Sequence, residues 1–365
     1  MQDSLQISDS GYILWCITVA WTNLRGTSYG LDSIEFYQNV VLRQKNRADF
    51  NKFLYIHERK YAMEKYLAYC SFLPTLTTGP IILYDTFERG FLVDDGEIRK
   101  KYVKLFCQIG RYGFWLLFTE VVLHFLYTNA MERYPWWVQN LSPWEMYGYG
   151  YLLGQFFLLK YVVIYGISGA LTRAYGVNAP PTPKCIARIH RYSDMWRYFD
   201  PGLHSFLFRY VYLPMRSCYS ELLTNNLFNK IMSSSFCFFY IYIWHGTKPY
   251  IMIWSFLNYL AVTIETICDA IEASDFYQNL TKKYLSHYWQ LRFNSAITCP
   301  LLAMSAISNF YFFAGLDIGT IFLEKFLYAD WSVNLTLFGF LYAACNVSHK
   351  IKIWENRRME KSKKQ

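Results

Sequence analysis

The chain has 365 residues, of which 53% are hydrophobic and 17% charged, and its formal net charge is +9. Soluble domains carry about 25% charged residues, so this composition argues against an ordinary soluble domain and favours a membrane protein. The basic residues lie beside apolar stretches rather than on one polar face, which argues against nucleic acid as a partner.

Apolar windows long enough to cross a bilayer recur along the chain, and about 20 residues are needed for one span. In chain order they are Tyr61–Tyr84, Leu105–Tyr127, Met146–Ala170, Asn226–Trp244, Tyr250–Cys268, Phe293–Ala314 and Trp331–Cys345, with Gly11–Trp21 as a shorter candidate. The sequence therefore predicts an all-α, polytopic membrane protein with about seven or eight spans.

The segment between the third and fourth windows is different in character. It opens with the proline-rich run Ala179–Cys185, which cannot continue a helix. Its acids and arginines lie among aromatic residues; they are Asp194, Arg197, Asp200 and Arg209. A simple span would exclude these charges, and a simple soluble loop would carry fewer aromatic residues. The pattern favours a re-entrant or interfacial segment that lines a cavity.

A single histidine, His245, lies in the triplet Trp244-His245-Gly246, between two stretches without charge. A titratable side chain within an apolar segment is a functional-site hypothesis by default, because its burial has a free-energy cost. The alternative interpretation is an interfacial histidine at the end of a span.

Basic flanks lie at Arg43–Lys60, Arg99–Lys104 and Lys350–Gln365, and the positive-inside rule places such flanks in the cytosol. Lys361 and Lys363 resemble a dilysine retrieval signal of endoplasmic-reticulum membrane proteins, although an ordinary basic tail would look the same. Nine cysteines without a pairing pattern argue against a disulfide framework.

Several short motifs occur in a fixed order. They are Phe72–Ile81, Pro180–Cys185, Met195–Asp200, Gly202–His204, Arg209–Pro214, Trp244–Gly246, Leu257–Leu260 with Val262–Glu265, and Phe338–Tyr342. In this order and spacing they resemble the membrane-bound O-acyltransferase superfamily, and within it the hedgehog acyltransferases. The resemblance covers nearly all of residues 30–355.

Two departures from the family pattern stand out. Family members carry further spans before the position of residue 30, so the chain is expected to be shortened at its N-terminus. The family's Gly-Gly after the Tyr-x-Pro motif is replaced here by Met215 to Cys218.

The resemblance implies a catalytic pair formed by His245 and Asp200. Near neutral pH a neutral imidazole can remove the proton from an amine or a hydroxyl that attacks a thioester. For Asp200 the residues themselves also allow a salt bridge to Arg197 or Arg209, or an N-cap for a helix that starts at Pro201.

The same resemblance implies a haem whose iron is bound by the Cys185 thiolate, and an acyl-CoA site. Its predicted residues are Trp196, Arg197, Trp244 and Asn258. Core packing is an equally good interpretation of Trp196. Asn258 and Glu265 lie seven residues apart on one helix face, so they either form a network near His245 or join helices.

The predicted organisation is an N-terminal segment at 1–30 with a short possible span, an acyltransferase membrane domain at 31–355 and a basic cytosolic tail at 356–365. The predicted activity is transfer of a long-chain acyl group, palmitoyl, from acyl-CoA to the amine of the N-terminal cysteine of a secreted hedgehog-type protein. The expected partners are acyl-CoA, that secreted protein and membrane lipid, in the endoplasmic reticulum or alternatively the Golgi.

Two other functions stay open at this point. One is an O-acyltransferase that acts on a glycerol-type or glycolipid acceptor, and the other is a catalytically silent regulator with the same fold. A transporter is disfavoured, because the paired inverted repeats typical of transporters are not visible in the sequence.

Overall fold

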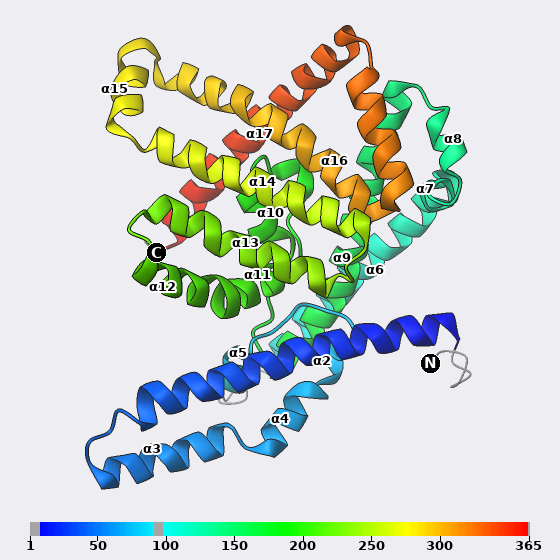
Figure 1. Cartoon of the computed structure of the whole chain (residues 1–365). Helices are drawn as coiled ribbons and strands as arrows, with labels where there is room; N and C mark the ends of the chain where they lie inside the picture. The colour runs from blue at the N-terminus through cyan, green and yellow to red at the C-terminus, as the bar shows by residue number, and fades with distance from the viewer. Residues whose placement is uncertain (1–7, 91–97, 364–365) are drawn as a thin grey trace. The chain divides into compact units, whose positions relative to one another are not determined.

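The computed structural model describes residues 8–90 and 98–363 (Figure 1). All regular secondary structure in these ranges is helical, which confirms the expected all-α class there. The chain divides into two compact units, each described by itself below. The first comprises Met1–Leu117, Lys160–Thr182 and Asp200–Tyr210, and the second Phe118–Leu159, Pro183–Phe199 and Val211–Gln365.

The predicted boundaries at residues 30 and 355 stay predictions. Residues 1–7 of the predicted N-terminal segment and residues 364–365 of the predicted basic tail lie outside the described residues.

Helices that lie wholly or partly in the first unit come mostly from the first third of the chain. They are α2 (Asp9–Phe36), the π-helical turn η1 (Tyr37–Val41), α3 (Arg47–Lys60), α4 (Met63–Cys70), the 3-10 turn η2 (Leu73–Thr75), α5 (Tyr84–Gly90), α6 (Ile98–Phe125), α9 (Pro143–Ala174), α11 (Pro201–Leu207) and the π-helical turn η4 (Phe208–Tyr212).

The second unit contains the remaining helices and the other parts of α6, α9 and η4. They are α7 (Thr128–Met131), α8 (Pro135–Gln139), the 3-10 turn η3 (Ile186–Arg188), α10 (Tyr192–Phe199), α12 (Leu213–Leu222), α13 (Asn226–Trp244), α14 (Pro249–Glu272), α15 (Asp275–Tyr284), α16 (His287–Tyr328) and α17 (Trp331–Lys363).

In the second unit, α12, α13, α14, α16 and α17 pack successively against one another (Figure 1). The predicted span Asn226–Trp244 coincides with α13, and the windows at Met146, Tyr250 and Phe293 lie within α9, α14 and α16. The core of this unit lies where α8, α9 and α16 meet. Its buried residues are Val138, Met146, Tyr149, Leu153, Phe310, Ile318 and Phe322.

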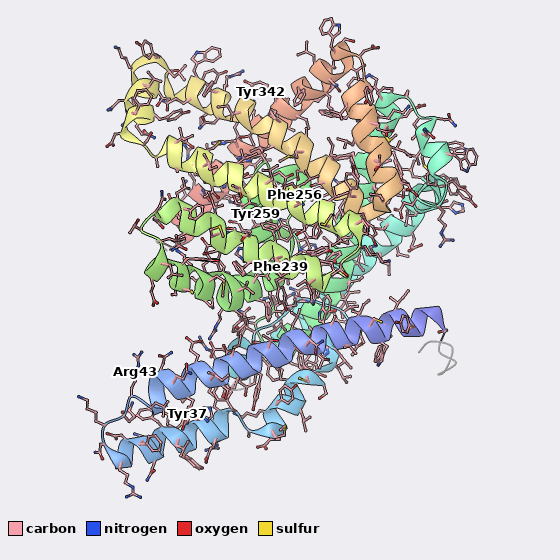
Figure 2. The ribbon with its side chains drawn as sticks, viewed as in Figure 1. Tyr37, Arg43, Phe239, Phe256, Tyr259 and Tyr342 are labelled. Atoms are coloured by element: carbon pink, nitrogen blue, oxygen red, sulfur yellow. The ribbon has the colours of Figure 1, made fainter. Side chains whose placement is uncertain are left out.

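Within residues 8–90 and 98–363, three helices have the length and composition of membrane spans. They are Pro143–Ala174, Pro249–Glu272 and Tyr288–Tyr328. On α13 and α14, Phe239 and Phe256 are each 59% exposed, and Figure 2 shows their side chains among those that project from these helices. Large exposed apolar side chains of this kind are typical of surfaces that contact lipid or another protein.

The predicted span at Tyr61–Tyr84 is wrong. The chain there forms α4, η2 and an irregular stretch up to α5, because Gly79 has φ +139° and is followed by Pro80, which has no N–H to donate. The interrupted character expected of residues 174–225 is confirmed, since that segment holds only short helices and turns.

Side chains of α2 donate hydrogen bonds to carbonyl oxygens of the irregular stretch. Arg25 is buried; its Nη1 donates to the carbonyl oxygen of Cys70 at 2.8 Å, and its Nη2 donates to both oxygens of Thr75. Trp21 Nε1 donates to the carbonyl oxygen of Gly79 at 3.1 Å. Carbonyl groups without partners in the helices are satisfied from α2, as irregular backbone inside a membrane protein requires.

Helix α16 is bent about two thirds of the way along its length, at Gly315. Gly315 has φ +81°, a left-handed conformation that interrupts the helix and that glycine adopts without a steric penalty. Across the bend, the rings of Phe310 and Phe322 stack with centroids 3.8 Å apart. The bend therefore folds one end of α16 back onto the core of the second unit.

We expect the substitution Arg25→Met to destabilise the first unit. It keeps much of the side-chain volume but leaves the carbonyl oxygens of Cys70 and Thr75 without a charged donor. The expected loss in the free energy of unfolding is roughly 2–4 kcal/mol. Thermal unfolding in detergent should show a lower midpoint, and hydrogen exchange should accelerate first at residues 71–83. Arg89→Met, at a side chain 71% exposed, is the matched control and should unfold like the wild type. Equal midpoints for the two variants would contradict the expectation.

Candidate active site

The turn between α13 and α14 presents His245. The N–H of Gly246 bonds to the carbonyl oxygen of Ile243 at 3.2 Å, and that of Thr247 to the carbonyl oxygen of Tyr242 at 3.3 Å. These two bonds form a Schellman motif, in which the residue after the C-cap is left-handed and is usually glycine. Gly246 has φ +106°. The glycine of the Trp-His-Gly triplet thus ends α13 so that His245 is the C-cap.

Three aromatic rings surround the imidazole of His245 edge-on. The ring centroids of Trp244, Trp254 and Phe312 lie 4.8, 5.3 and 5.1 Å from that of the imidazole. Trp254 and Phe312 also stack on each other at 4.3 Å. Within the described parts of the chain, no hydrogen bond to a ring nitrogen of His245 is present.

The electrostatic effect of these surroundings is to keep His245 uncharged. Burial lowers the pKa of His245 to about 4, because few polar groups replace the water that a charged imidazolium would need. At neutral pH the imidazole is therefore neutral and has a lone pair that can accept a proton.

The rings of Trp244, Trp254 and Phe312 form an aromatic wall around His245, and Trp196 packs against this wall. Its ring lies 5.7 Å from that of Trp254 and 5.1 Å from that of Phe238, and its Nε1 donates to Asn258 Oδ1 at 3.2 Å. Trp196 is thus packed one ring away from His245, as the core-packing interpretation of this residue expects. Arg197, the next residue, is exposed.

Asn258 joins helices. Its Oδ1 accepts from Trp196, and its Nδ2 donates to the carbonyl oxygen of Trp254 at 2.8 Å and to Ser308 Oγ at 3.4 Å. Because protein groups engage the whole amide, the structure gives Asn258 a packing role. The predicted contacts of acyl-CoA with Trp196, Arg197, Trp244 and Asn258 stay predictions.

Glu265 holds the start of α10. Its Oε1 accepts from the N–H of Tyr192 at 2.6 Å, and its Oε2 from that of Ser193 at 3.0 Å. A carboxylate at a helix N-terminus satisfies free N–H groups and interacts favourably with the helix dipole. Glu265 thus binds the start of α10 to α14, and Asn258 binds Trp196 of α10 to α14. The face of α14 that carries Asn258 and Glu265 therefore joins helices.

Asp200 caps α11 in the first unit. Its Oδ1 accepts from the N–H of Leu203 at 2.9 Å, its Oδ2 accepts from Tyr165 Oη at 2.9 Å, and Pro201 is the first helical residue. The predicted N-cap is confirmed. Burial raises the pKa of the Asp200 carboxyl, and these hydrogen bonds oppose the shift.

Arg209, one of the two predicted salt-bridge partners of Asp200, is instead paired with Asp32 and Glu35. Asp200 and His245 belong to different compact units. Their catalytic pairing stays a prediction.

Cys185 lies half-buried at the start of η3. The cations on either side of it, Lys184 and Arg188, both pair with Glu355 of α17. The haem assignment for Cys185 stays a prediction from resemblance.

Trp254 and Phe312 were missed by the reasoning from sequence. A weak signal for Trp254 exists, because it lies four residues before Asn258 on the same face of α14. No signal in the sequence brings Phe312 of α16 to His245.

Comparison with known proteins identifies the family of the chain. Residues 12–309 match the model of the membrane-bound O-acyltransferase family. The chain is 33% identical over 309 residues to the protein-cysteine N-palmitoyltransferase Rasp of Drosophila melanogaster, which covers 84% of this chain and 57% of that protein. It is 27% identical over 283 residues to the protein-cysteine N-palmitoyltransferase HHAT of Mus musculus, with 77% and 56% covered.

A more distant relative is the membrane-bound O-acyltransferase GUP1 of Saccharomyces cerevisiae, 22% identical over 271 residues, with 70% of this chain and 46% of that protein covered. The chain spans little more than half the length of Rasp and HHAT. It belongs to the membrane-bound O-acyltransferase family and is a multi-pass membrane protein.

We expect Glu265→Gln to loosen α10. The amide that replaces the carboxylate places a donor opposite one of two backbone N–H groups and removes the charge, which lowers the stability by roughly 1–3 kcal/mol. The thermal unfolding midpoint should fall, and the tryptophan emission should shift as Trp196 becomes more exposed.

The matched control is Asp269→Asn. It removes the second partner of Arg191, whose side chain is paired with both acids, but this aspartate is 53% exposed and contacts no helix end. Its effect should stay within about 0.5 kcal/mol. A larger effect for Asp269→Asn than for Glu265→Gln would count against a capping role.

Proposed function

We propose that the protein transfers a palmitoyl or similar long acyl group from acyl-CoA to the amine of an N-terminal cysteine on a secreted protein. The observation that carries the proposal is the neutral imidazole of His245, half-buried among Trp244, Trp254 and Phe312. The palmitoyl group and the cysteine acceptor are suggested by the names of the relatives from Drosophila and mouse.

In the proposed reaction the acceptor amine attacks the carbonyl carbon of the thioester, and its proton passes to the free ring nitrogen of His245. The tetrahedral intermediate then collapses. The carbon–sulfur bond breaks and the amide forms. The thiolate of CoA leaves and is protonated by the imidazolium. Asp200 stabilises the cationic stage, either the incoming ammonium or the imidazolium.

The aromatic wall has a separate task in this proposal. Its rings pack against the acyl chain next to the thioester and exclude water, so that the thioester carbonyl is attacked by the amine and is not hydrolysed. The proposed location is the endoplasmic reticulum, for which the lysines near the C-terminus are the supporting feature.

A second candidate is an O-acyltransferase with a glycerol-type or glycolipid acceptor, which the similarity to the yeast O-acyltransferase favours. The same imidazole would deprotonate a hydroxyl. Only the acceptor distinguishes the two candidates, so the acceptor is the variable to test.

We expect purified protein to transfer labelled palmitate from palmitoyl-CoA to a short peptide with an N-terminal cysteine. His245→Ala should lower the rate by roughly 10²–10⁴-fold, the usual contribution of a general base. Asp200→Asn should also lower it. His124→Ala, at an exposed histidine of α6, is the control and should leave the rate unchanged.

The acceptor is tested in parallel with an N-acetylated peptide and a glycerol-type alcohol. Labelling of the alcohol alone would replace the proposal with the O-acyltransferase. Absence of transfer to every acceptor by the wild type would favour the catalytically silent regulator. Equal rates for wild type and His245→Ala would rule out the base.

The pH dependence should follow the acceptor and not the histidine. Because the pKa of His245 is lowered to about 4, the imidazole is already deprotonated throughout the assay range. The N-terminal amine has a pKa of about 7.7–8.0 and must be neutral to attack. We therefore expect kcat/KM for the peptide to rise from pH 6 to pH 8. A peptide analogue with a hydroxyl in place of the amine should give a flat profile over this range. An inflection near pH 6.5 with both acceptors would contradict the neutral, buried imidazole.

A further inference from the structure

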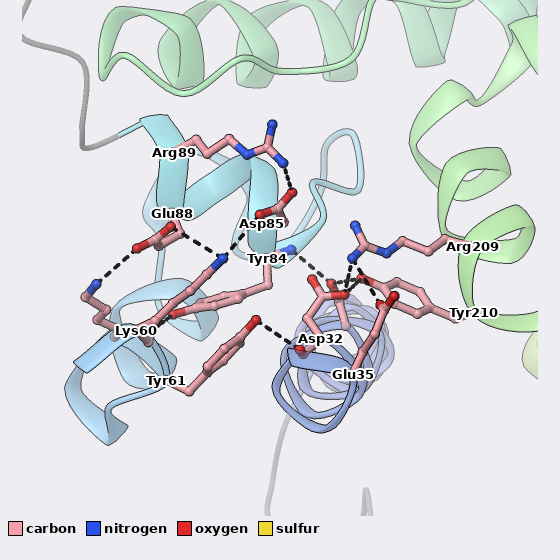
Figure 3. A network of polar contacts seen from close by, with 12 residues as sticks. Asp32, Glu35, Lys60, Tyr61, Tyr84, Asp85, Glu88, Arg89, Arg209 and Tyr210 are labelled. Atoms are coloured by element: carbon pink, nitrogen blue, oxygen red, sulfur yellow. Dashed lines mark hydrogen bonds and ion pairs between the residues drawn. The ribbon is translucent and has the colours of Figure 1, made fainter. Parts of the chain in front are cut away.

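A charge pair with a buried carboxylate joins the N-terminal helix α2 to the turn η4 that follows α11. Asp32 of α2 has a side chain only 1% exposed, and its Oδ1 lies 2.8 Å from Arg209 Nη2 (Figure 3). The same oxygen accepts from Tyr210 Oη at 2.9 Å. Removing Arg209, whose side chain is 36% exposed, would leave the buried Asp32 carboxylate without its charged partner, so this contact restrains Arg209 and Tyr210.

Ser28, one turn before Asp32, adds two hydrogen bonds to this contact, and all donors point towards Asp32. Its Oγ accepts from the N–H of Tyr84 at 2.9 Å and lies 2.8 Å from Tyr210 Oη. Since Tyr210 donates to Asp32, Ser28 must donate to Tyr210. The resulting chain of donors runs from Tyr84 through Ser28 and Tyr210 to Asp32, and hydrogen bonds aligned in this way strengthen one another.

The contact of Asp32 with Arg209 and Tyr210 is called the anchor below. Helix α11 connects it to Asp200. The helix has seven residues, with Asp200 as its N-cap, and it runs directly into the π-helical turn that carries Arg209 and Tyr210. At 1.5 Å per residue, the distance from Asp200 to the anchor is about 14 Å. A helix this short has little freedom to bend, so a shift at one end moves the other.

The other end of α11 is also in close contact with its surroundings. A Cβ on Gly202 would lie 2.4 Å from the carbonyl oxygen of Ile81, so the helix backbone rests directly against the irregular stretch before α5. Tyr165 holds the Asp200 carboxylate itself. Within the first unit, α11 is therefore fixed at its start by backbone contact and at its end by Asp32.

We propose that Asp32 is a positioning residue for acyl transfer, which with Ser28 fixes the end of α11 through Arg209 and Tyr210 and thereby sets the place of Asp200. This inference rests on the proposed function, in which Asp200 takes part in the reaction. Asp32 itself touches neither substrate nor the reacting atoms in this scheme.

The test is a double-mutant cycle on the full-length protein with palmitoyl-CoA and the cysteine peptide. Asp32→Asn should lower kcat by roughly 10–100-fold with little change in KM for palmitoyl-CoA, because a displacement of about 1 Å at a reacting group can have that effect. In the Asp200→Asn background the same substitution should have almost no further effect on kcat. Residues that act as one unit are non-additive in this way, whereas general damage to the fold would lower both backgrounds equally.

The control is Glu35→Gln. Glu35 lies on the same helix and pairs with the same arginine at 3.5 Å, but its side chain is 60% exposed. Its removal should leave kcat unchanged. Hydrogen exchange gives a readout without activity: the amide of Leu203, which bonds to Asp200, should exchange faster in Asp32→Asn and not in Glu35→Gln.

If Asp32→Asn does not fold, Tyr210→Phe replaces it in the cycle, since this variant removes one donor and keeps the charge pair. Full kcat in a folded Asp32 or Tyr210 variant, or equal losses in both backgrounds, would overturn the positioning role. Absence of transfer by the wild type would instead overturn the proposed function, and full activity of Asp200→Asn would remove the role of Asp200 on which this inference rests.

Discussion

The first unit depends on the hydrogen bonds that the buried guanidinium of Arg25 donates to Cys70 and Thr75. The stretch between α4 and α5 has only the backbone hydrogen bonds of η2, and Arg25 supplies donors to the carbonyl groups of Cys70 and Thr75. In a medium without water, each such group would otherwise be left unsatisfied at several kcal/mol. The same stretch then offers the surface on which Gly202 rests. Arg25 thus helps to hold the backbone against which the start of α11 packs.

The second unit uses the opposite charge for a similar purpose. The carboxylate of Glu265 satisfies the free N–H groups at the start of α10, and Asn258, two turns earlier on α14, binds the indole of Trp196. Polar side chains on one helix thus determine where an aromatic residue of another helix lies. Around His245, by contrast, the neighbours are rings that offer the imidazole no charge, and this difference keeps the imidazole neutral while its surroundings stay ordered.

Local features of this structure could be predicted from the sequence. The apolar run at Asn226–Trp244 matched α13, and the Asp200-Pro201 pair indicated the cap of α11. Both depend on neighbouring residues only. The Tyr61–Tyr84 window failed because its mean composition is apolar although Pro74 and Pro80 lie within it, and apolarity does not distinguish a helix from irregular backbone whose carbonyl groups are bound by a distant arginine. Phe312 and the contact of Asp32 with Tyr210, 178 residues apart in sequence, depend on packing that no local pattern encodes.

The bend at Gly315 has a consequence for how this protein can vary. Phe310 and Phe312 lie two residues apart on α16, and the first packs on Phe322 in the core while the second packs on His245. A side chain at position 315 would strain the left-handed backbone and alter the bend that brings Phe310 and Phe322 together. The angle of the Phe312 ring would change with it. Variation at a glycine whose added Cβ would meet no other atom can therefore alter the surroundings of His245, through the geometry of one helix shared by the core and the aromatic wall.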